Sequence, residues 1–134
     1  MRITQEADYA VRIIDCIARS EGRMDARSIS ETTGVTLRFT LKILRKLNQS
    51  GIVRSFQGVQ GGYELARPPQ QINLREVIEA VDGPICISRC LTDELSCSQQ
   101  ENKELCYYHS VFAEISKTIR RRLESVTFCG RGND

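Results

Sequence analysis

The 134-residue sequence has no apolar run long enough to span a bilayer, and its opening residues, MRITQEADYA, contain no apolar signal core. We therefore expect neither membrane insertion nor export, but a cytoplasmic protein. Disulfide frameworks are rare in a reducing cytoplasm, so the six cysteines favour metal binding or thiol chemistry over structural bridges. The apolar fraction of 40% and the charged fraction of 27% are ordinary for one globular domain with a modest core.

Acidic residues are absent from Thr32 to Tyr63, although the net charge of the whole chain is only +2. Residues 1–67 have a net charge of +4, and the remainder has a net charge of −2. The window without acidic residues contains Arg38, Lys42, Arg45, Lys46 and Arg54. Such a window suits a polyanion, because each neutralised phosphate releases condensed counterions. A solvated helix face is the alternative that charge alone leaves open.

Capping residues and helical spacing predict three helices in the first fifty residues. Thr4 can cap the first helix, whose apolar positions are Ala7, Val11, Ile14 and Ala18. Asp25 can cap a short second helix that continues to Thr33 and is ended by Gly34. Thr36 can cap a third helix, ended by Gly51, with an apolar stripe of Leu37, Leu41, Leu44 and Leu47. Two helices joined by a glycine-containing turn are the outline of a helix-turn-helix.

The segment GIVRSFQGVQGGYELAR follows the third helix and predicts a β-hairpin with strands over 52–56 and 63–66. A hairpin directly after a basic helix is typical of a winged helix. The helix then enters the major groove, and the wing touches the flanking backbone or the minor groove. The DNA contacts expected from this arrangement are Thr36, Arg38, Lys42, Arg45, Gln57, Gly58 and Gly61. An unrelated small mixed domain is the alternative.

Two further helices are predicted in the second half of the chain. Asn73 can cap a short one over INLREVIEAVDGP, with Glu76 completing a capping box. A longer helix over 105–128 has a heptad-like seam, interrupted by Arg122, of Leu105, Tyr108, Phe112, Ile115, Ile119 and Val126. A domain of this size cannot bury such a seam alone, so we expect a homodimer that presents two DNA-binding heads to a palindromic operator. Packing of the helix on its own domain is the alternative.

The predicted fold is therefore mainly α with a small β-hairpin wing. We expect a winged helix-turn-helix DNA-binding domain over 1–83 and a cysteine-rich loop over 84–104. A dimerisation helix over 105–128 and a flexible tail over 129–134 complete the expected organisation.

Three cysteines and the only histidine of the chain lie in the segment CLTDELSCSQQENKELCYYH. Thiolates are the usual ligands of iron–sulfur clusters, and histidine can replace cysteine on one iron. Cys106 and His109 are three residues apart, which places their side chains on one helix face. A zinc site with the same donors lacks the usual closely spaced cysteine pairs. A thiol switch among Cys86, Cys90 and Cys97 would also account for the segment, as would loop cysteines without a shared role.

Four segments, MRITQEADYAVRII, LKILRKLNQSGIVRS, QGGYELARPP and REVIEAVDG, resemble the bacterial iron–sulfur cluster regulators, the family that includes IscR, NsrR and CymR. The resemblance extends from Met1 to about Phe128 and implies a dimeric winged-helix transcription regulator. Some members sense iron–sulfur status, nitric oxide or redox change through a cluster. Other members lack the cluster and respond through thiols or a partner protein.

The resemblance also implies a ligand set, whose three cysteines would be Cys90, Cys97 and Cys106. In IscR-like members the fourth ligand is a histidine three residues after the last cysteine, which His109 matches. In nitric-oxide-sensing members it is an acidic residue from the partner subunit, and Asp8 occupies that position. His109 ligation favours a 2Fe–2S cluster, whereas a 4Fe–4S cluster is the alternative with Asp8.

The sequence departs from the family pattern in its wider cysteine spacing, in the additional thiol of Cys86, and in Gln57, which replaces a wing arginine. We expect a transcriptional regulator whose operator affinity is controlled by an iron–sulfur cluster. A cluster-free regulator of the same fold, controlled by thiols or by a partner, is the alternative. An enzyme using Cys106 and His109 as nucleophile and base is not expected, because no oxyanion element or substrate motif is recognisable. A partner-binding module without DNA contact is a third possibility.

Overall fold

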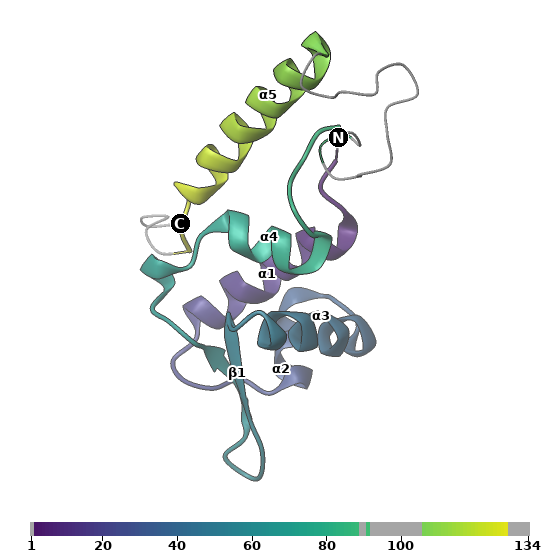
Figure 1. The fold of residues 1–134 in the computed structure, drawn as a ribbon. Coiled ribbons are helices and arrows are strands. Elements are labelled where there is room, and N and C mark those ends of the chain that lie inside the picture. The colour runs from purple at the N-terminus through teal and green to yellow at the C-terminus, as the bar shows by residue number, and fades with distance from the viewer. Residues whose placement is uncertain (1, 89–90, 92–105, 129–134) are drawn as a thin grey trace.

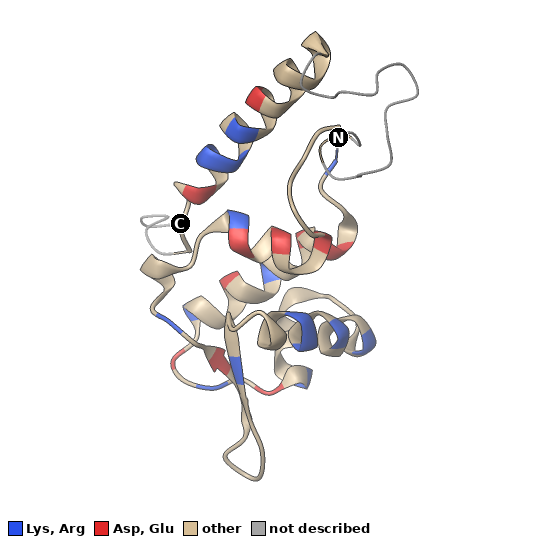
Figure 2. Cartoon of the chain, in the orientation of Figure 1, with Lys and Arg blue, Asp and Glu red and all other residues tan. Residues whose placement is uncertain are grey.

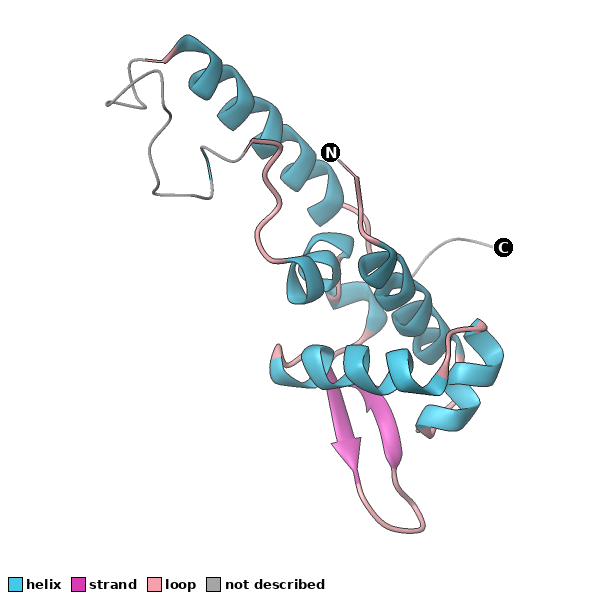
Figure 3. Ribbon diagram, turned by 90° about the vertical axis from the view of Figure 1, so that its right-hand side faces the viewer, coloured by secondary structure: helices cyan, strands magenta, loops and turns pink. Residues whose placement is uncertain are grey.

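The computed structural model describes residues 2–88, 91 and 106–128. The described elements are α1 (Gln5–Arg19), α2 (Ala26–Thr33), α3 (Leu37–Gln49), β1 (Val53–Phe56), β2 (Gly62–Leu65), the 3-10 turn η1 (Pro69–Gln71), α4 (Leu74–Asp82) and α5 (Tyr107–Glu124). Helices α1 to α4 form the body of the molecule (Figure 1). The β1–β2 hairpin and α5 project from opposite ends of this body (Figure 3). The predicted class, mainly α with a hairpin wing, is confirmed.

Four predicted N-caps begin the helices of the body. A main-chain N–H in the first turn donates, across 2.7–3.3 Å, to the side chain of Thr4, Asp25, Thr36 or Asn73. Glu76 completes the predicted capping box, because its carboxylate accepts from the main-chain N–H of Asn73 at 3.3 Å. Each cap satisfies a donor that the helix itself leaves unpaired, so short local motifs fix where these helices begin.

A core of branched aliphatic side chains holds α1, α2, α3 and α4 together. Its largest fully buried members include Ile13, Ile14, Ile29, Ile43, Leu44, Leu47, Ile72 and Val77. Burial of a side chain of this size contributes roughly 1.5–3 kcal/mol. The core therefore fixes α3 as a rigid element on one side of the body.

The predicted apolar stripe of α3 is wrong at two positions. Leu37 and Leu41 are 36% and 45% exposed, whereas the buried side chains of α3 are Thr40, Ile43, Leu44 and Leu47. The neighbouring helices cover the face around Ile43, which turns the Leu37–Leu41 edge toward solvent. Thr40 tolerates burial because its hydroxyl donates to the Val35 carbonyl at 3.4 Å.

The two strands pair antiparallel, with Val53 opposite Leu65 and Phe56 opposite Gly62. The segment before α2 adds an isolated bridge at the same hairpin. Met24 and Tyr63 exchange two main-chain hydrogen bonds of 2.7 and 3.0 Å. Consequently the wing is attached to the helix-turn-helix through β1 and also through the α1–α2 connection.

Helix α5 ends at Glu124, four residues before the predicted end. The chain then extends alongside the start of α4, where the N–H of Leu74 donates to the Val126 carbonyl at 2.8 Å and the N–H of Phe128 donates to Ile72 at 3.3 Å. Phe128 packs against the core, so tertiary pairing replaces the last helical turn. The helix begins at Tyr107, two residues after the predicted start, with Cys106 as its extended N-cap. Residue 105, the tail over 129–134 and most of the cysteine-rich loop lie outside the described residues.

Candidate nucleic-acid interface and metal centre

The face of α3 opposite the core is basic. Arg38, Lys42 and Arg45 are all exposed and recur at three- and four-residue spacing, so they form one row along the helix. Figure 2 shows α3 with basic bands and no acidic ones. Thr36 lies at the N-terminal end of this row as the cap. A rigid helix with this row on its outer face is suited to enter a polyanionic groove.

One acidic side chain lies beside this row. The carboxylate Oε1 of Glu6, in the first turn of α1, is 2.8 Å from Lys46 Nζ and 3.9 Å from Lys42 Nζ. The Glu6 side chain is 22% exposed, which makes it less screened than a fully exposed carboxylate. Glu6 therefore lowers the positive potential at the α1-facing edge of α3. The gap in acidic residues from 32 to 63 did not reveal this contact, because Glu6 is distant in sequence.

The wing turn contains Gln57, Gly58 and Gly61, three of the predicted DNA contacts. Gly58 has a φ of 91°, and a Cβ on Gly61 would lie 2.5 Å from the main-chain oxygen of Phe56. Both glycines are therefore needed by the turn itself. Gln57 is exposed, and Val59 at the tip is fully exposed. The structure thus places the predicted wing residues on a projecting loop, well away from the core.

Arg23 supports the wing and was not identified from the sequence. Its guanidinium carbon lies 3.4 Å from the ring centroid of Phe56, and Nη1 donates to the Gln60 carbonyl at 3.0 Å. Its Nε is 3.5 Å from the Glu64 carboxylate. These contacts join residues about forty positions apart, so a local sequence pattern gives no signal for them. They hold the hairpin in one orientation relative to α2 and α3.

Two of the four predicted cluster ligands, Cys106 and His109, lie within the described residues. Cys106 is the N-cap residue of α5, and its thiol is free. His109 follows within the first turn of the helix, and both side chains are half-buried. Cys90 and Cys97 lie outside the described residues. Across the portion of the chain that the structure describes, no three His, Cys, Asp or Glu side chains gather as metal ligands would.

Asp8, the alternative fourth ligand, is exposed in the first turn of α1. Its Oδ2 is 2.9 Å from Arg12 Nη2, one helical turn further along. Both side chains are about half exposed, at 51% and 55%, so this pair contributes little to stability. The ion pair leaves Asp8 accessible to another molecule.

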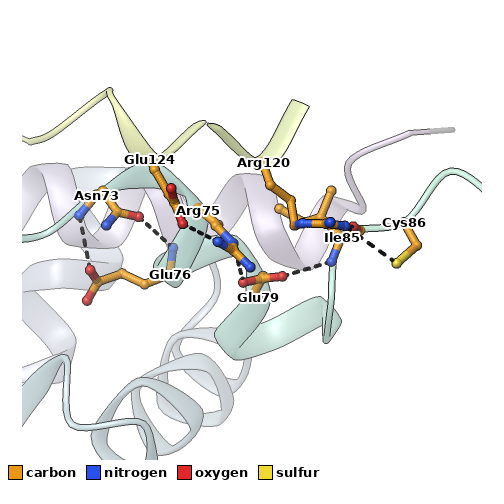
Figure 4. Close-up of polar contacts among 8 residues, drawn as sticks. All are labelled: Asn73, Arg75, Glu76, Glu79, Ile85, Cys86, Arg120 and Glu124. Carbon is orange, nitrogen blue, oxygen red and sulfur yellow. Dashed lines mark hydrogen bonds and ion pairs between the residues drawn. The ribbon is translucent and has the colours of Figure 1, made fainter. Parts of the chain in front are cut away.

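The start of the cysteine-rich loop is anchored to two helices at Ile85. Its main-chain N–H donates to the Glu79 carboxylate of α4 at 2.9 Å, and its carbonyl accepts from Arg120 of α5 at 2.9 Å (Figure 4). The same Arg120 nitrogen lies 3.9 Å from Cys86 Sγ. One residue further, the N–H of Ile87 donates to the buried Ser116 hydroxyl at 3.0 Å.

Arg75 completes the connection between α4 and α5. Its Nε lies 2.8 Å from Glu79, and its Nη1 pairs with Glu124 near the end of α5 (Figure 4). The hydrogen bond to Glu124 raises the pKa of the Arg75 guanidinium, which stays protonated. Glu79 and Arg75 thus link Ile85 to α4, the helix that packs on α1 and α3.

The outer part of α5 exposes large apolar side chains. Tyr107, Tyr108, Phe112 and Ile115 are 73%, 67%, 37% and 42% exposed. Three of them belong to the predicted seam. Beyond Ile115 the helix returns to the body, where Ile119 and Leu123 pack against Ile78 and Ile85. None of the helices that the structure describes has the length and apolarity that a bilayer crossing needs.

A helix-turn-helix with a basic outer helix and a braced hairpin defines a winged-helix DNA-binding regulator. Comparisons with known proteins specify it further. A family model described as "Iron-dependent Transcriptional regulator" (Rrf2) matches residues 3–129, and the chain belongs to this family. Its relatives are transcriptional regulators and not enzymes.

Among curated relatives, the HTH-type transcriptional regulator IscR of Xenorhabdus nematophila is 33% identical over 129 residues, covering 95% of this chain and 76% of the relative. Among solved structures, IscR of T. potens has a TM-score of 0.71 at 25% identity and covers 96% of this chain and 83% of that one. CymR, the global cysteine regulator of B. subtilis, has a TM-score of 0.75 at 22% identity, covering 96% and 93%. At that identity the CymR structure supports the fold alone.

Proposed function

We propose that this regulator is a cytoplasmic homodimer whose affinity for palindromic operator DNA is controlled by an iron–sulfur cluster. The observation that most directly supports the cluster is that the free Cys106 thiol and His109 lie three residues apart at the start of α5. The segment that leads toward Cys90 and Cys97 is anchored to this same helix through Ile85.

The donor set fits a cluster of the mixed thiolate and imidazole type. Cys106 and His109 lie at the N-cap and in the first turn of one helix and are half-buried, which suits ligands that must be shielded from bulk water. Cys90 and Cys97 would supply the remaining thiolates, and Asp8 of a second subunit is the alternative to His109. When bound, such a cluster would supply reversible one-electron chemistry. Its loss would leave the protein in a second state, without the cluster.

The exposed apolar side chains of α5 support a dimer. A second copy packed antiparallel or parallel against Tyr108, Phe112 and Ile115 would remove these side chains from water. A two-fold axis along this interface places two basic α3 helices at equivalent positions, as a palindromic duplex requires. Each α3 helix would enter the major groove through Arg38 and Lys42, with the wing loop on the flanking backbone.

The contacts around Ile85 supply a route from the cluster region to the DNA-binding head. Regulation requires that the two states of the cysteine-rich loop favour different arrangements of the DNA-binding heads. If both loop states favoured the two arrangements equally, the equilibrium between the arrangements would not change. Glu79 and Arg120 hold the root of this loop between α4 and α5. A change in the loop would therefore alter the angle between α5 and the body.

A cluster-free thiol switch is the second candidate, and the position of Cys86 supports it. Cys86 is half-buried, its thiol is free, and it borders a cavity of about 340 Å³ between the N-terminus, α4 and α5. Oxidation there would disturb the Ile85 anchor directly, because Cys86 follows it in the chain and also contacts Arg120.

The test is purification of the full chain without oxygen, followed by iron, acid-labile sulfide and zinc analysis and a visible spectrum. We expect iron and sulfide in the wild type and in Cys16→Ala, and loss of most of both in Cys106→Ala. Cys16 is a matched control because it is also free but contacts Met24 in the body. Stoichiometric zinc without sulfide would contradict the cluster. Metal-free protein whose DNA affinity changes reversibly with oxidant, but not in Cys86→Ala, would establish the thiol switch instead.

A further inference from the structure

A cavity of about 330 Å³ between the start of α4 and the second half of α5 is lined mainly by cations. Its lining residues are Arg75 of α4 and Lys117, Arg120, Arg121 and Glu124 of α5. Figure 2 shows basic bands on the half of α5 that is nearer the body. The hairpin and α5 project from opposite ends of the body (Figure 3), so this positive charge is not part of the DNA-binding face.

The carboxylates at this cavity do not neutralise it. Glu79 and Glu124 both pair with the same cation, Arg75 (Figure 4). Lys117 and Arg121 are exposed and form no ion pair with any residue that the structure describes. The four cations that line the cavity exceed these two carboxylates by two, which leaves a net charge of +2.

The cations converge on the cavity from two helices. Lys117 and Arg121 are four residues apart, so their side chains lie next to each other on α5. Arg75 reaches the cavity from α4, and its Nε and Nη1 are held by the two carboxylates. Arg120 is likewise held, because its Nη1 donates to the carbonyl of Ile85 at 2.9 Å. Two fixed guanidinium groups and two uncompensated cations thus border one small volume.

The proposed dimer leaves this cavity open. Lys117 follows Ile115 by two residues, and a helix with about 3.6 residues per turn places these two side chains on nearly opposite sides of α5. A second copy that packs on the exposed apolar face around Ile115 therefore does not cover Lys117. The cavity remains accessible to a small molecule from solvent.

The size and charge of the cavity match a doubly charged oxyanion. Its volume is at the lower end of the range that small-molecule sites occupy. Guanidinium groups bind phosphate through paired N–H donors, and lysine adds a compact positive charge. We propose that this cavity binds the phosphate group of a small molecule between Lys117 and Arg121 of α5 and Arg75 of α4. The site needs neither DNA nor a cluster, so it is independent of the function proposed above.

The experiment measures the binding of inorganic phosphate to the full chain by calorimetry, in chloride buffer of constant ionic strength. Lys117→Gln/Arg121→Gln removes two cations of the cavity. Arg27→Gln/Arg122→Gln is the control, because it removes two exposed cations that do not line the cavity. Succinate is titrated in parallel as a doubly charged carboxylate. The substituted side chains are all exposed, so both variants should fold, which circular dichroism checks.

We expect the wild type and Arg27→Gln/Arg122→Gln to bind phosphate with equal affinity. In Lys117→Gln/Arg121→Gln the dissociation constant should rise about tenfold or more, because charge-assisted hydrogen bonds are lost. Succinate should bind the wild type more weakly than phosphate does. If the cavity variant does not fold, Lys117→Gln alone should show a smaller loss of the same kind.

Three results would overturn the inference. The wild type could bind no phosphate, or the variant of the cavity could keep the wild-type affinity. Equal losses in the two double variants would show only a general effect of net charge. Tighter binding of succinate than of phosphate would assign the cavity to carboxylates and contradict the proposed ligand class. None of these results bears on the cluster or on DNA binding, because neither iron nor DNA is present in the titration.

Discussion

Arg120 of α5 donates a 2.9 Å hydrogen bond to the carbonyl of Ile85, and the N–H of the same residue is held by Glu79 of α4. A single residue is thus fixed from both sides by two helices that are far apart in sequence. Because Ile85 lies at the start of the cysteine-rich loop, this anchor connects that loop to the DNA-binding body. The first prediction concerns its removal.

Arg120→Ala should reduce the difference in operator affinity between iron-loaded and iron-free protein. It should also lower the free energy of unfolding by about 1–2 kcal/mol, because a partly buried carbonyl loses a charged donor. The affinity difference is measured by fluorescence anisotropy on both forms. Arg122→Ala is the control, since Arg122 is exposed on the same helix and bonds its neighbour Ser125. An undiminished difference in Arg120→Ala would show that the anchor does not couple the loop to the head.

Glu6→Gln should raise the affinity for DNA about threefold at low salt, because a carboxylate beside Lys42 and Lys46 is neutralised. The gain should shrink as salt is added, because salt screens the interaction. Asp15→Asn makes the same change of charge on the same helix, beside Arg19 instead of α3, and should change little. In the same titrations Lys42→Ala should reduce the slope of log affinity against log salt by about one. An unchanged slope would mean that Lys42 contacts no phosphate.

Ile115→Asp should convert the proposed dimer into a monomer, raising the dimer dissociation constant on the order of a hundredfold. In one chain the side chain is 42% exposed and tolerates a charge, whereas in the interface that charge would be buried without a partner. Sedimentation velocity measures the change. Val59→Asp, a fully exposed position on the wing, should leave the sedimentation coefficient unaltered. A monomeric wild type, or a dimeric Ile115→Asp, would rule out this face of α5 as the interface.

The Asp25 cap should make the stability depend on acid pH. Hydrogen bonding to the N–H and hydroxyl of Ser28 lowers the pKa of Asp25, so its carboxylate takes up a proton more readily in the unfolded chain. Its stabilising effect is therefore complete above about pH 4 and is lost as the pH falls further. Asp25→Asn keeps a cap without the charge. The unfolding temperature of the wild type should fall toward that of Asp25→Asn between about pH 4 and pH 2, and a constant difference would contradict this origin.

The sequence predicted the features that depend on neighbours in the chain. Caps such as Asp25 and Asn73, and the spacing of Cys106 and His109, involve residues three or four apart, so local patterns contain the necessary information. The order of helix, glycine turn and hairpin was sufficient to predict the winged-helix fold, because few architectures have their elements in this order. Helix starts were accordingly placed correctly where a capping side chain exists.

The failures concern contacts between distant segments. Leu41 was expected in the core because α3 has apolar side chains on more than one edge, and only its neighbours decide which edge is covered. The Arg75–Glu124 pair spans 49 residues, and no local periodicity reveals it. Likewise an extended segment replaces the last predicted turn of α5, because Phe128 packs against the hydrophobic core of the helical body.

The last prediction concerns the fourth ligand, for which His109 and Asp8 compete. His109 follows Cys106 by three residues at the start of α5, so one subunit can supply both ligands. Asp8 is on α1 and would have to come from a second subunit, while its Oδ2 already lies 2.9 Å from Arg12. Preorganisation therefore favours His109, and an imidazole ligand favours a 2Fe–2S cluster. The choice is tested by variants that separate ligation from charge.

His109→Ala should lose most of the iron and sulfide found in the wild type purified without oxygen, whereas Asp8→Asn should keep both. His109→Cys should retain the cluster with a lower reduction potential, because thiolate donates more negative charge than imidazole. Retention in His109→Cys also shows that the loss in His109→Ala reflects a missing ligand and not a disrupted helix start. Iron content, the visible spectrum and a redox titration measure these outcomes. Full iron in His109→Ala together with loss in Asp8→Asn would instead assign the fourth position to the carboxylate of the partner subunit, with a 4Fe–4S cluster shared across the dimer.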